Sequence, residues 1–310
     1  MNNILVTGAN GFIGKSFLNK LKGDKLFDDD NIILLSSNKI DGDICILHKN
    51  YNFKKEDFYE NGIEHVDILV HIGAFIPKNF KEKDNIEKSI SNINNTMYLL
   101  NNLPSIPKKI IFLSTIDIYG DTNEIIDENK IPQPDSQYGM SKLFCEKMLE
   151  VWCNERNVIL QILRIGHIYG IGEEKYGKLI PSVMKNIISN ERPVIYSDGN
   201  EKRSFLHVDD CCRLIIKSFD LNTSMGPINI VSNKARKIVE IVNDIIDISG
   251  KNIEPKILKN KVETKNLVFD NKKMESILGK EKILFYKGLK EEYEYFQERE
   301  NKKLFLKKKI

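Results

Sequence analysis

The chain of 310 residues is 41% hydrophobic and 29% charged, which is ordinary for a globular protein and excludes a disordered chain, a collagen-like repeat and a disulfide scaffold. Lys and Arg number 47 and Asp and Glu number 44, so the net charge of +3 gives no reason to expect a nucleic-acid partner. No apolar run approaches the roughly 18 residues of a membrane span, and the N-terminus lacks the features of a signal peptide. We therefore expect a cytoplasmic protein without a membrane span.

Five cysteines, at positions 45, 145, 153, 211 and 212, show no C-x-x-C spacing. Their number and spacing favour reduced, buried thiols over a metal site or a redox pair.

The first half of the chain alternates short apolar runs with stretches of helical periodicity. The expected strands are residues 4–7, 32–35, 68–71, 110–114 and 158–163, and the expected helices are residues 12–21, 90–100 and 142–152. Continuous apolar strands separated by helices predict a parallel sheet covered on both faces, which is an α/β fold.

The alternation weakens after the fifth expected strand, and the loops become longer. This change predicts a first domain of residues 1–165 and a smaller lobe of residues 166–310. Residues 205–208 and 228–231 are apolar enough to return to the sheet. The two parts are therefore expected to interleave around residues 205–231.

A glycine-rich turn, T-G-A-N-G-F-I-G, joins the first expected strand to the first expected helix. Gly8 permits a tight turn, Gly11 lets a pyrophosphate approach the backbone, and Gly14 lets the helix pack close to the sheet. The start of the helix, at Phe12 and Ile13, offers free N–H groups and a positive dipole end to the phosphates. The order of strand, turn and helix predicts a dinucleotide-binding site.

A possible acid–base site comes later in the chain. Tyr138 and Lys142 lie four residues apart in an expected helix, so both side chains fall on one face. A free tyrosine has a pKa of about 10, and a nearby ammonium group lowers that pKa. Ser114 and Thr115 end a strand, and open α/β sheets bind ligands at the carboxyl ends of their strands. A Y-x-x-x-K pair also occurs by chance on surface helices, so the spacing alone is a weak signal.

These motifs resemble the extended short-chain dehydrogenase/reductase superfamily, in its nucleotide-sugar epimerase/dehydratase branch, over nearly the whole chain. The G-x-x-G-x-x-G spacing is similar to that superfamily and differs from the G-x-G-x-x-G of ordinary dehydrogenases. Further similar motifs are G-D-I at 42–44, H-I-G-A at 71–74, N-I-N-N-T at 92–96, L-R-I-G-H-I-Y-G at 163–170, R-S-F-L-H-V-D-D at 203–210 and K-G-L-K at 287–290. The resemblance implies a Rossmann-like doubly wound parallel sheet with a smaller C-terminal substrate-binding lobe.

The resemblance also implies roles for single residues. Tyr138 is expected to exchange a proton with a sugar hydroxyl or ketone, Lys142 to hold the nicotinamide ribose and tune Tyr138, and Thr115 to hydrogen-bond the reacting oxygen. Arg203 is expected to clamp the diphosphate of the substrate. The implied substrate-binding residues are Thr115, Tyr138, His167 and Arg203. The implied cofactor-binding residues are Gly8, Gly11, Phe12, Ile13, Gly14, Ser36, Asp43, Ile44, Gly73, Ala74, Asn92, Ser114, Tyr138, Lys142 and His167.

Three positions depart from the family pattern. Ile116 stands where related 4,6-dehydratases carry an Asp that helps to eliminate water, and Asp117 stands where they carry Glu, so dehydration is not expected. His167 replaces an Asn, as in some 4-keto-reductases, although a structural histidine explains it equally well. Ser36 stands where NAD-preferring relatives have Asp for the ribose 2′-OH. With Lys39 nearby, we expect NAD or NADP, with a lean towards NADP, although the Arg that often grips NADP is absent.

The expected function is that of an NAD(P)-dependent oxidoreductase acting on a nucleoside-diphosphate sugar. Ser36 and His167 favour a 4-keto-sugar reductase. An NDP-sugar 4-epimerase with tightly bound NAD is the alternative, since both reactions use Thr115, Tyr138 and Lys142. A non-catalytic dinucleotide-binding sensor is a remote third reading, because such sensors typically lose the Tyr-Lys pair. The nucleotide base, the sugar and the product stereochemistry stay open.

The expected assembly is a homodimer built by the helices near residues 90–100 and 143–152. The family commonly pairs these two helices into a four-helix bundle. The second helix carries more apolar residues than one buried face requires, so it needs a second partner.

Overall fold

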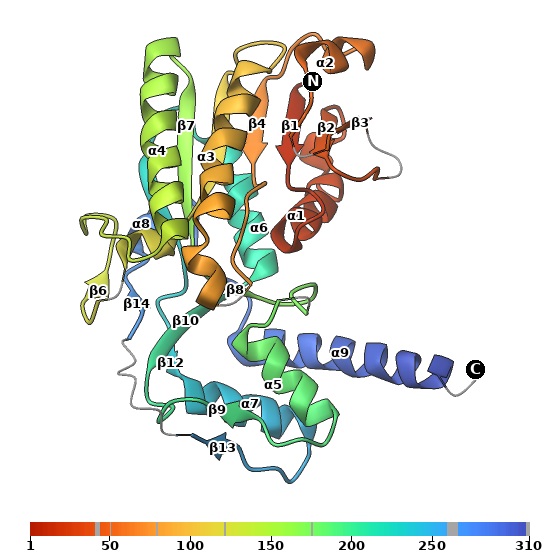
Figure 1. Cartoon of the computed structure of the whole chain (residues 1–310), viewed down its shortest axis with the longest axis vertical. Helices are drawn as coiled ribbons and strands as arrows, with labels where there is room; N and C mark the ends of the chain where they lie inside the picture. The colour runs from red at the N-terminus through yellow and green to blue at the C-terminus, as the bar shows by residue number, and fades with distance from the viewer. Residues whose placement is uncertain are drawn as a thin grey trace.

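The structure, a computed structural model, describes residues 1–40, 44–49, 51–78, 80–120, 122–174, 176–258 and 266–307. Its largest element is a seven-stranded sheet in the order β11-β7-β5-β4-β1-β2-β3, in which every pair of neighbours runs parallel (Figure 1). The strands are β1 (Asn3–Thr7), β2 (Asn31–Ser36), β3 (Ile44–Leu47), β4 (Ile68–His71), β5 (Lys109–Thr115), β7 (Ile159–Ile165) and β11 (Gly226–Ile230). The predicted α/β, Rossmann-like architecture is confirmed.

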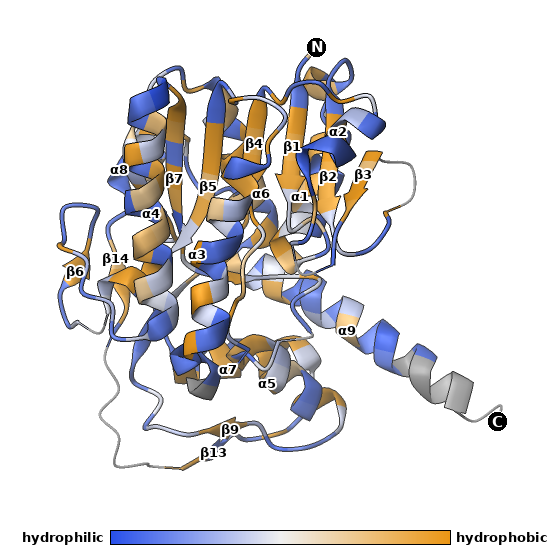
Figure 2. Ribbon diagram, turned by 45° about the horizontal axis from the view of Figure 1, so that its top comes forward, coloured by the Kyte–Doolittle hydropathy of each residue, from blue (hydrophilic) through white to orange (hydrophobic). Residues whose placement is uncertain are grey.

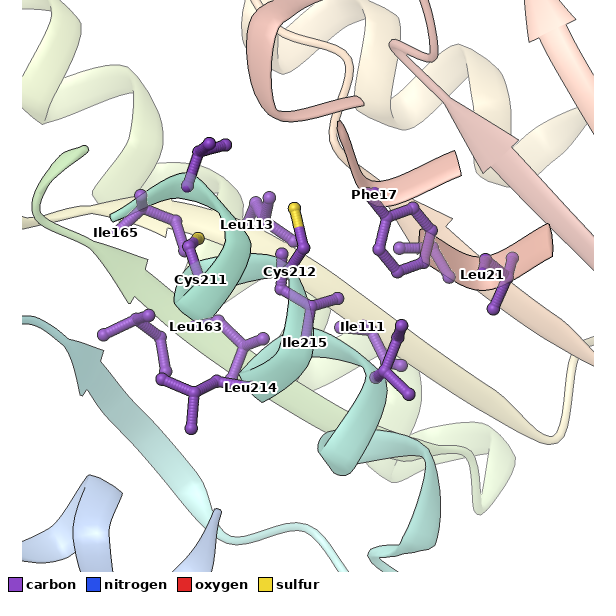
Figure 3. Packing of buried hydrophobic residues seen from close by; sticks show 14 of the residues in the cluster. Phe17, Leu21, Ile111, Leu113, Leu163, Ile165, Cys211, Cys212, Leu214 and Ile215 are labelled. Carbon is purple, nitrogen blue, oxygen red and sulfur yellow. The ribbon is translucent and has the colours of Figure 1, made fainter. Parts of the chain in front are cut away.

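Helices cover both faces of this sheet. α1 (Phe12–Lys22) and α6 (Val208–Lys217) pack on one face, and α3 (Ile86–Asn101) and α4 (Gln137–Arg156) pack on the other. The alternation of side chains along β1 sends Ile4 and Val6 towards the first pair and Leu5 towards the second. Figure 3 shows the first interface, where α1 and α6 meet over the strands. Both faces are therefore buried, which explains the continuous apolar strands of the sequence (Figure 2).

α4 is held in place by its N-cap and by a buried ion pair. The Ser136 hydroxyl accepts a hydrogen bond from the Gly139 N–H at 3.1 Å, and this capping starts the helix. Further along, the Glu146 carboxylate binds the Arg164 guanidinium of β7 at 2.8 Å, with both side chains buried. Arg164 also donates to the Tyr119 hydroxyl at 2.7 Å. These contacts fix the helix against the end of the sheet, where Tyr138 and Lys142 lie.

A smaller lobe lies beyond the carboxyl ends of the sheet strands (Figure 1). Its three-stranded sheet has the order β12-β10-β8, and a two-stranded sheet pairs β13 with β9. Its strands are β8 (His167–Tyr169), β9 (Val194–Ile195), β10 (Lys202–His207), β12 (Ala235–Lys237) and β13 (Lys256–Ile257), and its helices are α5 (Leu179–Ile188), α7 (Ile238–Ser249) and α9 (Phe285–Lys307). The three helices share one apolar cluster, and the far end of α9 extends away from the body.

The remaining elements are short. They are α2 (Lys55–Glu60), α8 (Lys272–Ile277), β6 (Ile125–Ile126), β14 (Val268–Phe269) and the 3-10 helices η1 (Lys25–Phe27), η2 (Phe80–Asp84), η3 (Ile116–Tyr119) and η4 (Ser218–Asp220). β6 pairs with β14, so the chain returns to the first lobe a second time near its C-terminal end. None of the described helices is both long and apolar enough to cross a membrane.

The two segments expected to return to the main sheet behave differently. β11 joins the sheet beside β7, and α6 covers the sheet face beside α1. The expectation for residues 205–208 was wrong, because Phe205 to His207 pair with β8 in the small sheet. The apolar pattern of β10 therefore reflects burial in the second lobe and not in the main sheet.

Candidate functional site

A cavity of about 910 Å³ opens where the carboxyl ends of the sheet strands meet the smaller lobe. Its volume suits a small-molecule ligand. The predicted site residues in its wall are Gly8, Gly11, Phe12, Ile13, Gly14, Gly73, Ala74, Ser114, Thr115, Tyr138, Lys142, His167 and Arg203. Residues from both halves of the chain are thus brought to one space.

The glycine loop is tight enough that no other residue fits at two of its positions. Gly8 has a φ of 73°, and a Cβ there would lie 2.6 Å from the Gly73 nitrogen. A Cβ at Gly14 would lie 2.1 Å from the Gly8 carbonyl oxygen. α1 begins at Phe12 with Gly11 as its N-cap and no side chain capping it, so the first-turn N–H groups face the cavity end of the helix. This geometry suits an anionic group such as a pyrophosphate.

A buried polar network supports the loop from behind. The Thr7 hydroxyl accepts a hydrogen bond from the Gly73 N–H at 2.9 Å and lies 2.8 Å from the His71 Nδ1. The other ring nitrogen of His71 lies 3.0 Å from the Thr96 hydroxyl. Burial, and then the charge of Lys142, lower the pKa of His71 to about 3, so the ring is neutral near pH 7. The motif around His71 was expected beside the cofactor, but the part played by Thr7 and Thr96 was not predicted.

Asn92 does not reach the cavity, although it was predicted to bind the cofactor. Its side-chain oxygen accepts from the Phe75 N–H at 2.7 Å, and its nitrogen donates to the Ser141 hydroxyl at 3.2 Å. Asn92 therefore ties the segment after β4 to α4. The partly buried amide of Phe75 needs a partner, and Asn92 supplies it.

The predicted adenosine contacts lie away from the cavity or cannot be placed. The Ser36 hydroxyl accepts from the Asn10 amide at 2.7 Å and donates to the Asn38 carbonyl at 2.8 Å, which joins the end of β2 to the glycine loop. Ile44 starts β3, is exposed and does not line the cavity. Asp43 lies outside the described residues.

Tyr138 and Thr115 lie together in the cavity wall where the sequence predicts the reaction, and we call this part the reacting end. Tyr138 opens α4, Thr115 ends β5, and both side chains are buried. Burial raises the pKa of Tyr138 above its usual value, the carboxylate of Asp117 raises it further, and a hydrogen bond with Thr115 acts in the opposite direction. The lowered tyrosine pKa expected from the sequence is therefore not found in this arrangement.

The position of Lys142 agrees with the absence of a lowered tyrosine pKa, because its ammonium group is bound by the backbone of β5. Its ammonium group donates to the Leu113 carbonyl oxygen at 2.6 Å and lies 4.1 Å from the centre of the Phe112 ring. Burial lowers its pKa to about 8, while Cys145 and Glu146 act in the opposite direction. Lys142 also lines the cavity, so its ammonium group can still reach a ligand bound there.

Among the buried polar atoms of the cavity wall that have no hydrogen-bond partner in the described part of the chain, two belong to predicted site residues. They are the Ser114 hydroxyl and the Nδ1 of His167. Buried polar groups are normally satisfied, so both atoms suit contacts to a ligand. The tight glycine cradle, the uncapped helix and these two atoms together fit a nicotinamide dinucleotide, held by Gly8, Gly11, Gly14, Ser114 and Lys142.

The part of the cavity that the sequence predicts to bind the substrate contains charged residues that the motifs did not reveal. Arg203, in β10, was predicted, whereas Lys83, Lys178 and Glu201 were not. Burial lowers the pKa of His167 to about 4, the charge of Asp117 raises it, and the charges of Arg203, Lys178 and Lys83 lower it. No sequence signal marked the two lysines, because each stands in a loop or a short turn without a recognisable pattern.

A pair of carboxyl groups is buried next to this region. Glu173 follows β8 and Glu292 lies in α9; both are fully buried, and Glu173 Oε1 and both Glu292 oxygens have no donor within the described residues. Burial raises the pKa of Glu173 to about 7 and that of Glu292 well above its usual value. Two buried carboxyl groups in contact oppose each other's ionisation, which favours a proton held between them. The pair fastens α9 to the chain segment that places Tyr176 and Lys178 in the cavity wall.

The described residues contain no cluster of three His, Cys, Asp or Glu side chains that could hold a metal ion. The five cysteines are free thiols, four of them buried.

Comparison with known proteins identifies the family. A profile of the NAD dependent epimerase/dehydratase family matches residues 4–230. A putative UDP-glucose 4-epimerase of Methanocaldococcus jannaschii is 26% identical over 301 residues, which cover 93% of this chain and 96% of that protein. The crystal structure of UDP-glucose 4-epimerase from Thermotoga maritima, with UDP-glucose, aligns with a TM-score of 0.83 and 25% identity, over 96% of this chain and 99% of that one.

A dTDP-D-glucose 4,6-dehydratase of Dictyostelium discoideum is 29% identical over 279 residues, or 79% of this chain. The match spans 62% of that protein, which is less than two thirds of its length. Taken together, the profile match over most of the chain, the parallel sheet and the dinucleotide cradle show that this chain is an enzyme of the NAD dependent epimerase/dehydratase family.

Proposed function

We propose that the chain acts at C4 of a nucleoside-diphosphate sugar as an NAD-dependent 4-epimerase. The observation that carries the proposal is that Thr115, Tyr138 and Lys142 meet on one wall of a cavity that also contains the glycine loop. Relatives named as 4-epimerases match nearly the full length of the chain and support this choice over the reductase that the sequence favoured.

Tyr138 would take the proton of the C4 hydroxyl and return it after the sugar has turned over. Its buried hydroxyl, next to Thr115, is placed to exchange a proton with an oxygen bound between the two. Thr115 would hydrogen-bond that oxygen and hold it next to the Tyr138 hydroxyl. The nicotinamide, when bound, supplies the acceptance and return of a hydride.

Lys142 would serve this exchange from the next turn of α4. Its buried ammonium can hydrogen-bond a ribose hydroxyl and favour the tyrosinate once a ligand draws it from the Leu113 carbonyl. Its lowered pKa means that it gives up its own proton more easily than an exposed lysine does.

The second lobe would bind the rest of the substrate. Arg203 lines the cavity from β10 and would clamp the diphosphate. We propose that residues 1–165 hold the dinucleotide and residues 166–310 the sugar nucleotide, with α6 and β11 serving the first part.

The test is to purify the chain, release and identify any retained dinucleotide, and incubate the protein with NDP-glucoses and NDP-galactoses of different bases. Interconversion of a glucose–galactose pair without added cofactor supports an epimerase. An empty site that takes up NADPH and reduces a 4-keto sugar would replace the proposal by the second candidate.

That second candidate is a 4-keto-sugar reductase using NADP. The observation that favours it is Ser36, an uncharged residue at the end of β2 where a carboxylate would repel a 2′-phosphate. In that reaction Tyr138 would give its proton to the sugar, which agrees with its raised pKa. The same incubation separates the two, because the reductase consumes cofactor in proportion to product.

We do not expect dehydration to a 4-keto-6-deoxy sugar. Elimination needs a donor for the leaving hydroxyl, and Ile116, which lines the cavity beside Thr115, cannot donate a proton. Losing an acid–base group costs about 10² to 10⁴ in rate. Ultraviolet detection of 4-keto sugars in alkali would reveal the product, and its rapid formation would show that another residue takes the missing role.

We further propose that the chain forms a homodimer through α3 and α4. Both helices carry exposed apolar side chains at the same spacing, four and then seven residues apart. These are Ile86, Ile90 and Met97 on α3, and Met140, Phe144 and Val151 on α4. The two helices pack side by side, and we propose that these six residues together make the apolar face that a second copy covers.

Light scattering measures the mass of the assembly in solution and so tests the homodimer. We expect roughly twice the 35.8 kDa mass of the chain. Phe144→Asp should give the monomer, whereas Ile131→Asp, at an exposed apolar residue elsewhere, should not change the mass. A monomeric unmodified protein at micromolar concentration contradicts the proposal.

A further inference from the structure

An ion pair at the reacting end of the cavity joins Asp117, from the motif that the dehydratases share, to Lys83, which belongs to no sequence motif. The Lys83 ammonium, from η2, lies 3.2 Å from Oδ1 of Asp117, in η3. The side chains are 35% and 26% exposed, so a ligand or water can reach both. Both residues line the cavity.

The backbone of Asp117 is fixed from two sides. Its N–H donates to the Thr115 hydroxyl at 3.2 Å, which is the same hydroxyl that hydrogen-bonds Tyr138. A Cβ added at Gly139, the residue after Tyr138, would lie 2.5 Å from the Asp117 carbonyl oxygen. The turn that carries Asp117 is therefore packed against the turn that carries Tyr138, and Lys83 holds the carboxylate at the end of the side chain.

The negative and positive side chains around the site shift the pKa of His167 in opposite directions. Asp117 raises the pKa of Tyr138, and it also raises that of His167. Lys83, Lys178 and Arg203 lower the pKa of His167 from three other elements. On the remaining sides Lys142 faces Leu113, and Glu201 accepts a hydrogen bond from the Ser197 hydroxyl at 2.6 Å. Lys83 is the cation that forms an ion pair with Asp117 among the residues described.

We propose that Lys83 is a positioning residue that holds and screens the Asp117 carboxylate beside the Tyr138 hydroxyl. The inference rests on the proposed role of Tyr138 in proton exchange. Without Lys83, the carboxylate loses its nearest positive charge and can turn towards Tyr138, where it opposes formation of the tyrosinate. With Lys83 present, the proton leaves Tyr138 more readily.

The proposal predicts opposite pKa shifts in two variants. Lys83→Met should raise the pKa of both Tyr138 and His167, because Asp117 is no longer screened. Asp117→Asn should lower both, because the source of the effect is removed. In the double variant the loss of Lys83 should matter much less, since there is no carboxylate left to screen. Lys83→Arg keeps the charge and should restore most of the normal behaviour.

The first measurement is the pH profile of kcat/KM, with the substrate identified by the incubation described above. We expect the rising limb to move to higher pH by about one unit in Lys83→Met and to lower pH in Asp117→Asn. A structural role of Lys83 would lower the rate at every pH and leave the limb in place.

The second measurement needs no activity. Titration of the histidine Cε1 protons by NMR, with His167 assigned from His167→Gln, should show the His167 pKa higher in Lys83→Met than in the unmodified chain and lower in Asp117→Asn. An unchanged His167 pKa in both variants would overturn the inference.

The two measurements separate the possible failures. If Tyr138→Phe stays active but the His167 titration shifts as expected, the proposed function fails and the ion pair stands. If Tyr138→Phe is inactive and neither the limb nor His167 moves, the inference about Lys83 is wrong and the function stands.

Discussion

The two ends of the cavity are built on different principles. The end formed by the glycine loop is made of backbone: Gly8 and Gly14 leave no room for a Cβ, and the N-terminus of α1 supplies the donors. The end formed by η2, η3 and β10 is made of charged side chains from segments far apart in the sequence, such as Lys83 and Arg203. The backbone end depends on the absence of side chains at its glycines. The side-chain end depends on how the fold brings distant segments of the chain together.

Tyr138→Phe tests the side-chain end and should have the largest effect. The ring stays packed and the proton is lost, so we expect turnover to fall by about 10² to 10⁴ while dinucleotide binding changes little. Activity assays and dinucleotide titration on the same preparation check both halves of the prediction. Tyr196→Phe, at an exposed tyrosine of the same cavity, serves as the control and should keep most of the activity.

The buried Glu173–Glu292 pair should make the stability of the second lobe depend on pH. Both folded-state pKa values lie above the usual carboxyl value of 4.5, and that of Glu173 is about 7. The stabilisation from the protonated pair is present below about pH 4.5 and is lost as pH rises through 7 and above. For Glu173 alone the change is on the order of 3 kcal/mol.

Thermal unfolding of the unmodified chain and of Glu292→Gln from pH 5 to 8.5 measures this. The glutamine cannot ionise, so the variant should lose less stability with rising pH. Glu64→Gln, at an exposed residue of the first lobe, should follow the unmodified chain. Parallel curves for all three proteins would mean that the pair does not titrate in this range.

Gly14→Ala tests the backbone end. Because the new Cβ would lie 2.1 Å from the Gly8 carbonyl oxygen, α1 must move away from the loop. Such overpacking costs about 1–3 kcal/mol, and the displaced helix should also bind a dinucleotide more weakly. Denaturant unfolding and dinucleotide titration give the two values. Gly177→Ala, whose Cβ would have its nearest contact at 3.8 Å, should leave stability nearly unchanged.

Ser36→Asp should have the smallest effect, on cofactor choice alone. A carboxylate at the end of β2 would repel a 2′-phosphate and bind a ribose 2′-OH, so the ratio of NADP to NAD affinity should fall by about tenfold, or 1.4 kcal/mol. Ser37→Asp, at the exposed neighbour, is the matched control. An unchanged ratio would place the adenosine ribose elsewhere than at the end of β2.

The difference between the two ends also explains what could be predicted from the sequence. The order of strands and helices and the glycine cradle follow from local patterns, and the structure has them. Asn92 and Ser36 were placed by resemblance alone; the first serves the Phe75 backbone and the second binds Asn10 and Asn38. Lys83 and Lys178 were missed, because nothing local distinguishes a lysine in a cavity wall from one in solvent.

The position of β11 has a consequence for how the chain can fold during synthesis. β11 completes the main sheet and α6 covers the face beside α1, but both follow β8 and β10 of the other lobe in the chain. A nascent chain that has reached residue 165 still leaves the edge of β7 unpaired and apolar residues such as Phe17 and Leu21 without their α6 partners. Residues 1–165 therefore cannot complete the main sheet alone on the ribosome, and about 65 more residues must emerge before β11 can join it.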